Sequence, residues 1–248
     1  MNIDTGDLAL LRLEAQTLFS LDTRSRIVHV NSPDNGPAPR LYLAGCASGN
    51  ILYLRNDVGD ETAATIARLA AEEPPLSEPA SNALHIDQYR QLLGAGDSPT
   101  ESWPGLIWTV PSERAFAHAA RLIRSDTSAG DDLLARLRAD GMSSALIDMG
   151  FTALSEFWPP WCVAMDSGDI ASIAFTVAQN EKAAEVGLAT MPAFRGRGFG
   201  AAATAGWASH PELGARALFY STSRANTSSQ RVVERLQLRF LGASLRIA

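Results

Sequence analysis

The chain has 248 residues, of which 46% are hydrophobic and 19% charged, so its composition is that of a globular protein with one large domain or two small ones. Its 21 basic and 27 acidic side chains give a net charge of −6, which argues against sequence-independent binding of DNA or RNA. Cys46 and Cys162 lie too far apart in the sequence to indicate a disulfide framework or a metal cluster.

Targeting signals are not evident in the sequence. Residues 1–7 include two acids and no base, the opposite of the start of a signal peptide. No uncharged apolar run approaches the roughly 18 residues that a membrane-spanning helix needs. We therefore expect a cytoplasmic protein that has no membrane partner.

Residues 1–100 carry the pattern of a small α+β unit whose role the sequence does not reveal. The predicted helices are one with Leu8, Leu11, Leu18 and Phe19 at helical spacing, one over Asp60–Glu73 and one over Ile86–Leu93. The predicted strands are Arg26–Asn31, Leu41–Ala44 and Asn50–Arg55. A linker is predicted over Gly94–Pro104, which divides the chain into residues 1–100 and 101–248.

Residues 101–248 read as a mixed α/β unit with parallel crossovers late in the chain. The predicted strands are Leu106–Val110, Trp161–Met165, Ile170–Ala178, Glu185–Met191, Ala217–Ser221 and Phe240–Ile247. The predicted helices are one opening at Ser112–Glu113 and carrying Phe116, Ala119, Ala120 and Ile123, a region over Asp131–Phe157 broken near Gly141 and Gly150, and helices over Gly198–Ser209 and Asn226–Leu236. The second and third strands are separated by the tight turn Asp166–Asp169 and should form a hairpin.

The loop that follows Pro192 is the segment most informative about chemistry. Gly198 and Gly200 sit where a turn becomes the first turn of a helix. Backbone N–H groups at a helix start have no intrahelical partner, and the helix dipole favours an anion there. Because Arg195 and Arg197 add positive charge beside this point, the loop is predicted to bind a phosphate or pyrophosphate.

Two common phosphate-binding loops do not fit this segment. A Walker loop needs Gly-Lys-Ser or Gly-Lys-Thr, and the chain contains neither tripeptide. A dinucleotide-binding fingerprint needs three glycines at a spacing that Gly196, Gly198 and Gly200 do not provide, and it should come early in its domain.

The pattern Arg195-x-x-Gly198-x-Gly200, placed between a strand and a helix, resembles the acetyl-CoA pyrophosphate loop of the GNAT acetyltransferase superfamily. The elements before and after the loop are similar to that family's fold in order and spacing, so the resemblance covers about residues 105–248. It implies a mixed, strongly twisted sheet flanked by helices, with residues 1–100 as an N-terminal α+β extension.

The resemblance also implies how acetyl-CoA would be held. In the family two neighbouring parallel strands splay apart and hold the pantetheine arm, and the loop amides hold the pyrophosphate. The residues implied to bind the cosubstrate are Thr190, Met191, Arg195, Gly196, Arg197, Gly198, Phe199, Gly200 and Asn226, and no metal is implied. Asn226 is equally suited to be the N-cap of its helix.

The catalytic groups are less well defined by the resemblance. Glu185 lies where several family members carry a glutamate that acts through water, although a strand glutamate beside a loop is also commonly just solvated. The family often places a tyrosine seven residues after the asparagine, where this chain has Val233. This departure leaves the general acid open, and Ser229 and Tyr220 are the candidate substitutes.

Charge is divided unevenly along the chain, and this division bears on function. Residues 191–248 hold 8 basic and 2 acidic side chains, whereas residues 101–190 hold 6 and 12. The basic end suits a polyanionic cosubstrate, and the acidic part favours a cationic acceptor.

We therefore expect an acetyl-CoA-dependent N-acetyltransferase, an acyltransferase that acts on a small-molecule or peptide amine. The alternative is a non-catalytic acyl-CoA-binding or sensor module of the same fold. Two roles are open for residues 1–100: they cover the acceptor side of the site, or they form an oligomer contact such as that of a homodimer.

Overall fold

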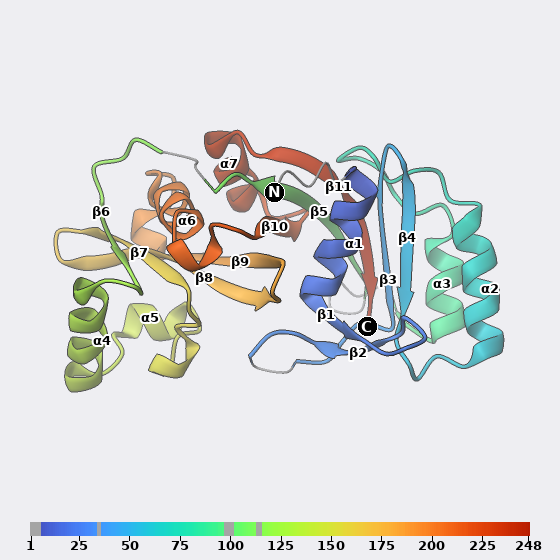
Figure 1. The fold of residues 1–248 in the computed structure, drawn as a ribbon, viewed down its shortest axis with the longest axis horizontal. Coiled ribbons are helices and arrows are strands. Elements are labelled where there is room, and N and C mark those ends of the chain that lie inside the picture. Colours follow the sequence, from blue (N-terminus) through green and yellow to red (C-terminus); the bar gives the residue numbers. More distant parts are fainter. Residues whose placement is uncertain (1–5, 34–35, 97–101, 113–115) are drawn as a thin grey trace.

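The computed structural model describes residues 6–33, 36–96, 102–112 and 116–248 (Figure 1). Its helices are α1 (Asp7–Leu18), α2 (Asp60–Ala71), α3 (Ile86–Leu93), α4 (Ser128–Asp140), α5 (Ser144–Asp148), α6 (Phe199–Ala208) and α7 (Thr227–Leu236). Its strands are β1 (Phe19–Leu21), β2 (Ile27–Val30), β3 (Leu41–Cys46), β4 (Gly49–Leu54), β5 (Ser102–Val110), β6 (Arg121–Arg124), β7 (Trp161–Asp166), β8 (Asp169–Gln179), β9 (Ala183–Thr190), β10 (Ala217–Ser223) and β11 (Arg239–Ile247). Short 3₁₀ helices cover Leu154–Glu156, Pro192–Phe194 and Pro211–Leu213.

One large sheet organises the molecule. Within the described ranges it has nine strands in the order β4-β3-β11-β5-β10-β9-β8-β7-β6. β9 and β10 are parallel, and the other neighbouring pairs are antiparallel. The N-terminal strands β3 and β4 extend this sheet because β3 pairs with β11, near the C-terminal end of the chain. The predicted mixed α/β sheet flanked by helices, with extra α+β elements from residues 1–100, is confirmed.

Helices cover both faces of the sheet, and the side chains of β9 show which helix covers which face. Successive residues of a strand point to opposite faces. Ala184 and Val186 pack in the same core as α6 and α7. Ala183 packs in the core beneath α1, and Ala189 packs against the core of α4 and α5. α1 and α5 therefore lie on the face opposite to α6 and α7.

β5 occupies an unexpected place in the sheet. It lies between β10 and β11 and is antiparallel to both, with Trp108 opposite Tyr220 on one side and Phe240 on the other. Its apolar run from Leu106 to Trp108 is buried, as is typical of a strand with both faces covered. The strand begins at Ser102, so the last three residues of the predicted linker are strand, and residues 97–101 lie outside the described residues.

The helix predicted to open at Ser112–Glu113 and to reach Ile123 is wrong over the described residues. Residues 116–120 are not helical, and 121–124 form β6, in which Ile123 pairs with Val163 of β7. The apolar residues did recur at helical spacing, but hydrogen bonding to the edge of the sheet determines the structure here. Glu113 itself lies outside the described residues.

The remaining predicted elements agree closely with the structure, apart from the end of the first helix. Phe19 was expected on that helix, but it begins β1 and its ring packs edge-on against Tyr42 at a centroid distance of 5.2 Å. The predicted breaks at Gly141 and Gly150 are present, and both residues have positive φ angles, +81° and +92°.

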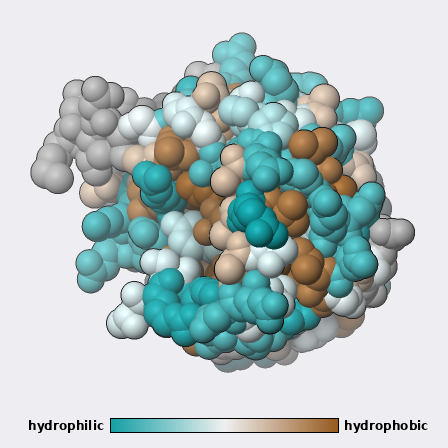
Figure 2. Space-filling model, turned by 90° about the vertical axis from the view of Figure 1, so that its right-hand side faces the viewer, coloured by the Kyte–Doolittle hydropathy of each residue, from teal (hydrophilic) through white to brown (hydrophobic). Residues whose placement is uncertain are grey.

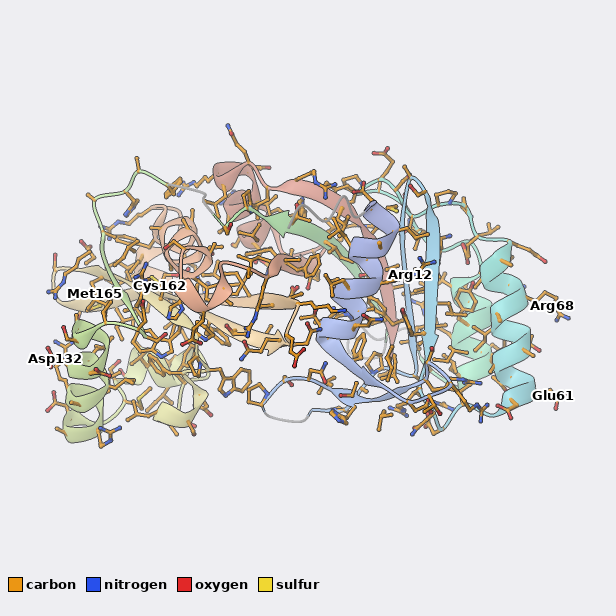
Figure 3. All side chains as sticks on the ribbon, viewed as in Figure 1. Arg12, Glu61, Arg68, Asp132, Cys162 and Met165 are labelled. Carbon is orange, nitrogen blue, oxygen red and sulfur yellow. The ribbon has the colours of Figure 1, made fainter. Side chains whose placement is uncertain are left out.

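The outer surface at the β4 end of the sheet is formed by α2 and α3. Hydrophilic side chains dominate this face, with small apolar patches between them (Figure 2). Glu61 and Arg68 project from α2 at this end (Figure 3). No helix among the described residues is both long enough and apolar enough to cross a membrane.

The junction of β3 with β11 generates a first prediction. A Cβ added at Gly242 would lie 2.0 Å from the carbonyl oxygen of Gly45, so Gly242→Ala should lower the free energy of unfolding by about 1–3 kcal/mol through overpacking. Denaturant titration would measure this change. Gly214→Ala is the control, because its φ is −59° and the nearest atom to its added Cβ would lie at 3.5 Å. Equal losses in the two variants would contradict the prediction.

Candidate functional site

The parallel strands β9 and β10 pair over only part of their length. Their register runs from Ala183 opposite Ala217 to Glu185 opposite Phe219, and there the pairing ends. Beyond this point β9 continues to pair with β8, and β10 with β5. The two strands therefore part into a fork, whose opening is bordered by backbone groups that have lost their strand neighbour.

A cavity of about 500 Å³ lies at the open end of this fork. Its lining comes from the end of β9, the loop before α6, the first turn of α6, the length of α7 from its N-cap to its last turn, and the end of α5. The lining residues are Asp148, Met149, Leu188, Ala189, Thr190, Pro192, Phe194, Arg195, Gly196, Gly198, Phe199, Gly200, Ala201, Asn226, Ser228, Ser229, Arg231, Val232 and Arg235. Neither α5 nor the arginines of α7 are among the residues predicted from the sequence to bind the cosubstrate.

The loop before α6 owes its shape to its glycines. Gly196 and Gly198 have φ angles of +77° and +96°, and Gly198 is the N-cap of α6. These left-handed conformations suit glycine, and they leave the first N–H groups of the helix without intrahelical partners. A Cβ at Gly200 would lie 3.1 Å from Thr190 Oγ1, so Gly200 lets the helix start close to β9. The result is an anion-binding helix terminus that opens onto the cavity.

His118 holds this loop from outside. The Ala120 N–H donates to His118 Nδ1 at 3.0 Å, so Nδ1 is the acceptor and Nε2 carries the ring proton that the Arg197 carbonyl accepts, also at 3.0 Å. The ring packs edge-on against Phe199 at 4.7 Å. The segment that was predicted to be a helix therefore serves instead to support the loop.

The arginines around the loop fall into two groups. Arg195, Arg231 and Arg235 line the cavity, and Arg235 Nη2 donates to the carbonyl of Gly196 at 2.6 Å. Arg197 is not part of the lining. Its guanidinium pairs with Asp166 at 2.9 Å and lies over the rings of Phe194 and Phe199. Positive charge at the cavity therefore comes mainly from α7. The sequence could have predicted this, because Arg231 and Arg235 are four residues apart and so lie on the same face of one helix.

Asn226 is both the N-cap of α7 and a lining residue. Its Oδ1 accepts a hydrogen bond from the Ser229 N–H at 3.1 Å, which fixes the start of the helix. Asn226, Ser228 and Ser229 all line the cavity. The terminus of α7 thus faces the same space as the terminus of α6.

Thr190 and Met191 follow each other at the end of β9 but have different surroundings. Thr190 lines the cavity, and its hydroxyl is 2.8 Å from that of Ser172. Met191 is buried and packs in the core of α4 and α5, away from the lining.

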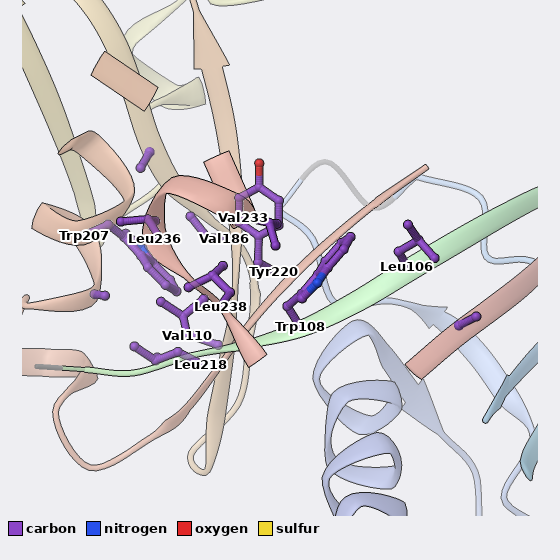
Figure 4. Close-up of a cluster of buried hydrophobic side chains, with 14 of the residues drawn as sticks. Leu106, Trp108, Val110, Val186, Trp207, Leu218, Tyr220, Val233, Leu236 and Leu238 are labelled. Carbon is purple, nitrogen blue, oxygen red and sulfur yellow. The ribbon is translucent and has the colours of Figure 1, made fainter. Parts of the chain in front are cut away.

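Tyr220 of β10 lies in the core beside the site. Its ring packs edge-on against Trp108 at 6.3 Å, and Figure 4 shows its hydroxyl pointing out of the apolar cluster that also contains Val233. That hydroxyl has no hydrogen-bond partner among the described residues. Burial raises the pKa of Tyr220 to about 12, although the neighbouring Ser229 hydroxyl acts to lower it. Tyr220 therefore retains its proton throughout the neutral pH range.

Glu185 lies where the fork begins. Its side chain is 2% exposed, so it is not a solvated surface residue, and it does not line the cavity. Its Oε1 accepts the N–H of Ser221 at 2.7 Å, so the carboxylate takes the place of the β9 carbonyl that β10 has lost. Burial raises the pKa of Glu185 to about 7, and Ser221 and Arg246 oppose the rise.

A second cavity, of about 680 Å³, lies between the β1–β2 hairpin and the end of β8. Trp158 and Pro159 line it on one side and His29 and Asn31 on the other. Ala178, which pairs with Glu185 across β8 and β9, also lines it. This cavity approaches the closed end of the fork from the end of β8.

Other chemistries find little support among the described residues. Cys162, which Figure 3 labels, is buried beneath α6, and burial raises the pKa of its thiol to about 12, so it is a poor nucleophile. No group of three or more histidine, cysteine or carboxylate side chains is arranged to hold a metal in the described ranges.

Comparison with known proteins places this site in a family context. Residues 120–239 match the family model described as the acetyltransferase (GNAT) domain. A GNAT acetyltransferase from Colwellia psychrerythraea is 12% identical with a TM-score of 0.45, and the match covers 98% of this chain and 96% of that one. A GCN5-related N-acetyltransferase-like protein from Streptococcus suis is 13% identical with a TM-score of 0.46, and the match covers 98% and 100%.

A structure from Novosphingobium aromaticivorans attributed to the GNAT family is 20% identical with a TM-score of 0.40. That match covers 59% of this chain and 66% of that one. No curated protein matches the chain.

Proposed function

Because residues 120–239 form a GNAT acetyltransferase domain, we propose that this protein is an acyltransferase that moves an acetyl group from acetyl-CoA to an amine. The observation that carries the proposal is the fork between β9 and β10, which opens into a cavity bordered by the N-termini of both α6 and α7. A long ligand with an anionic centre would fit this combination of features.

The residues present suit the parts of acetyl-CoA. The loop amides from Gly196 to Gly200 would receive the pyrophosphate. A Cβ at Gly200 would crowd Thr190 and Leu188 of the cavity lining, and one at Gly198 would press on Arg235 and His118. Arg195, Arg231 and Arg235 supply positive charge beside it. The pantetheine arm would lie in the fork and pair with the backbone of β9 as an added strand does.

The reaction would be direct attack of the neutral amine on the thioester carbon. A C–N bond forms and the C–S bond breaks, the amine loses one proton, and CoA leaves as a thiolate that takes up a proton. A β9 backbone N–H near Leu188 or Ala189 would stabilise the tetrahedral oxyanion. Glu185, with a pKa of about 7, is the proposed acceptor of the amine proton through water, because it lies at the closed end of the fork.

Tyr220 is the proposed general acid in place of the tyrosine that Val233 replaces. Its hydroxyl is buried, has no hydrogen-bond partner among the described residues and remains protonated at neutral pH. Ser229, at the start of α7, lies beside it and lines the cavity. The two residues would pass a proton toward the leaving sulfur.

The second candidate function is an acyl-CoA-binding sensor that has lost catalysis, and Val233 is the observation that favours it. Release of free CoA thiol from acetyl-CoA in the presence of a panel of amines separates the two functions. Cofactor binding without turnover on any small-molecule or peptide amine would support the sensor.

The loop generates a second prediction. Gly198→Asp should abolish thermal stabilisation by CoA. Its Cβ would lie 3.0 Å from Arg235 Nη1, so the added carboxylate would neutralise an arginine of the cavity at a position whose φ of +96° strains any side chain. A ligand at a hundred times its Kd stabilises a protein by about 2.7 kcal/mol, so the loss is measurable as a change in melting temperature. Gly168→Asp is the matched control, since Gly168 has the same φ, lies in the β7–β8 turn and is not part of the cavity. Unchanged stabilisation in the Gly198 variant would refute the cosubstrate assignment.

Tyr220 generates a third prediction. Tyr220→Phe should lower kcat about tenfold, less than the usual hundredfold or more for a general acid, because a thiolate leaves easily. The KM for acetyl-CoA should stay unchanged because Tyr220 does not line the cavity. Steady-state kinetics would measure both values, and Ser229→Ala should show a loss of similar size, because Ser229 connects Tyr220 to the cavity. Wild-type turnover in Tyr220→Phe would exclude the tyrosine from proton transfer.

A further inference from the structure

Glu14 of α1 is an ionisable residue in an apolar core, and the proposed function makes no use of it. Its exposed fraction is 0%, and it lies on the helix face that also buries Leu11, Ala15 and Leu18. Its Oε2 accepts a hydrogen bond from the Tyr42 hydroxyl at 2.5 Å. Its Oε1 has no hydrogen-bond partner among the described residues. A buried carboxyl with one unsatisfied oxygen is costly unless another interaction compensates.

Glu14 and Glu185 approach the same region from two parts of the chain. α1 packs against β3, β9 and β11, which are the strands of Tyr42, Glu185 and Arg246. Arg246 is opposite Tyr42 in the β3–β11 register, and its guanidinium lies 5.5 Å from the centre of the Tyr42 ring. Oε2 of Glu185 also has no hydrogen-bond partner among the described residues. Among the described residues, Arg246 is therefore an arginine that acts on both of these buried carboxyls, each of which has one such oxygen.

The pKa of Glu14 depends on the charge of Glu185. Burial raises the pKa of Glu14 to about 8, and the charge of Glu185 adds to the rise. Arg246 acts to lower the pKa of both carboxyls, and the Tyr42 hydrogen bond lowers that of Glu14. The other ionisable groups within reach are Tyr53 of β4 and Tyr220 of β10, and burial raises the pKa of each phenol, so both stay neutral.

Charge balance favours one proton on the pair. With one carboxyl ionised and one protonated, the cluster with Arg246 is neutral, whereas two ionised carboxyls would leave an uncompensated buried charge. Such a pair titrates in two coupled steps. Glu185 accepts from the backbone N–H of Ser221, which can only donate, whereas the Tyr42 hydroxyl can also accept a hydrogen bond from a protonated Glu14. Ionised Glu185 with protonated Glu14 is therefore the favoured arrangement.

We propose that the N-terminal segment completes the proton-transfer site of the GNAT domain, with Glu14 as the positioning residue that shares one proton with Glu185. This inference rests on the proposed function. When Glu185 accepts the proton that the amine loses, both carboxyls are protonated. The proton returns to solvent as the CoA thiolate is protonated and released. Ionisation of Glu14 would place a second buried anion beside the fork and oppose formation of the oxyanion.

A measurement that does not need activity tests the shared proton. Carboxyls with raised pKa values in the folded protein stabilise it fully below their unfolded pKa and lose that contribution as pH rises through the folded pKa. The melting temperature should therefore fall as the pH rises from the ordinary carboxyl pKa of 4.5 to about 8, and level off above that. Glu14→Gln should remove a large part of this fall because the amide cannot ionise. Glu181→Gln, an exposed glutamate in the turn before β9, should leave it unchanged.

Kinetics then tests the role in the reaction. The kcat of the wild-type protein should decline above pH 8 as Glu14 ionises, and this decline should disappear in Glu14→Gln. Tyr42→Phe is the conservative second variant. Removing its hydrogen bond, which lowers the pKa of Glu14, should move the decline to higher pH. A purely structural role for Glu14 predicts altered stability and no such shift.

The outcomes distinguish this inference from the proposed function. If acetyl-CoA binds and amines are acetylated, but Glu14→Gln and Tyr42→Phe keep the wild-type pH profile, the role of Glu14 is refuted. If Glu14→Gln and Glu181→Gln have the same pH dependence of melting temperature as the wild type, the shared proton is refuted. If the pH dependence of stability changes as expected but no amine is acetylated, the carboxyl pair stands and the proposed function fails.

Discussion

The early end of the pairing between β9 and β10 is the constraint on which the rest of the site depends. A parallel pair that continued would satisfy its own backbone and leave no space for a ligand. Because the register stops at Glu185 and Phe219, the later part of each strand faces an opening on one side. The loop after β9 then places the N-terminus of α6 at the mouth of this opening, and α7 brings its own N-terminus to the same cavity.

Where the strands part, their backbone groups lose their strand partners, and Glu185 supplies a hydrogen-bond acceptor for one of these groups. Its carboxylate accepts the Ser221 N–H, which holds the fork open at a defined width. When Glu185 is ionised, this role places a negative charge in the core, and burial of a charge is unfavourable without a counterion. Arg246 supplies the counterion from β11, and a proton on Glu14 avoids a second charge. The structural role of Glu185 thus prepares the group that the reaction would use.

The parts of this arrangement that could be predicted from the sequence are local ones. The loop pattern from Arg195 to Gly200 depends on conformations that glycine alone adopts readily, so its chemistry could be inferred from residue types. The position of β5 in the sheet could not be predicted from the sequence, because it depends on pairing with β10 and β11, which lie more than a hundred residues away. The same holds for β6. Its apolar residues recur at helical spacing, which predicted a helix, but the segment forms a strand because it pairs with β7. The burial of Glu14 could have been predicted from the sequence, because its spacing from Leu11 and Leu18 places it on the buried face of α1.

The two parts of the chain are joined by more than sequence. β3 extends the sheet through β11, and the close approach of Gly45 and Gly242 at this junction leaves no room for a side chain at position 242. Tyr42 and Arg246 are neighbours across the same junction, so the polar cluster around Glu185 contains residues from both parts. A fragment of residues 101–248 would lack Glu14 and Tyr42, and the edge of β11 that pairs with β3 would be exposed. The N-terminal segment therefore shares both the sheet and this polar cluster with the rest of the chain.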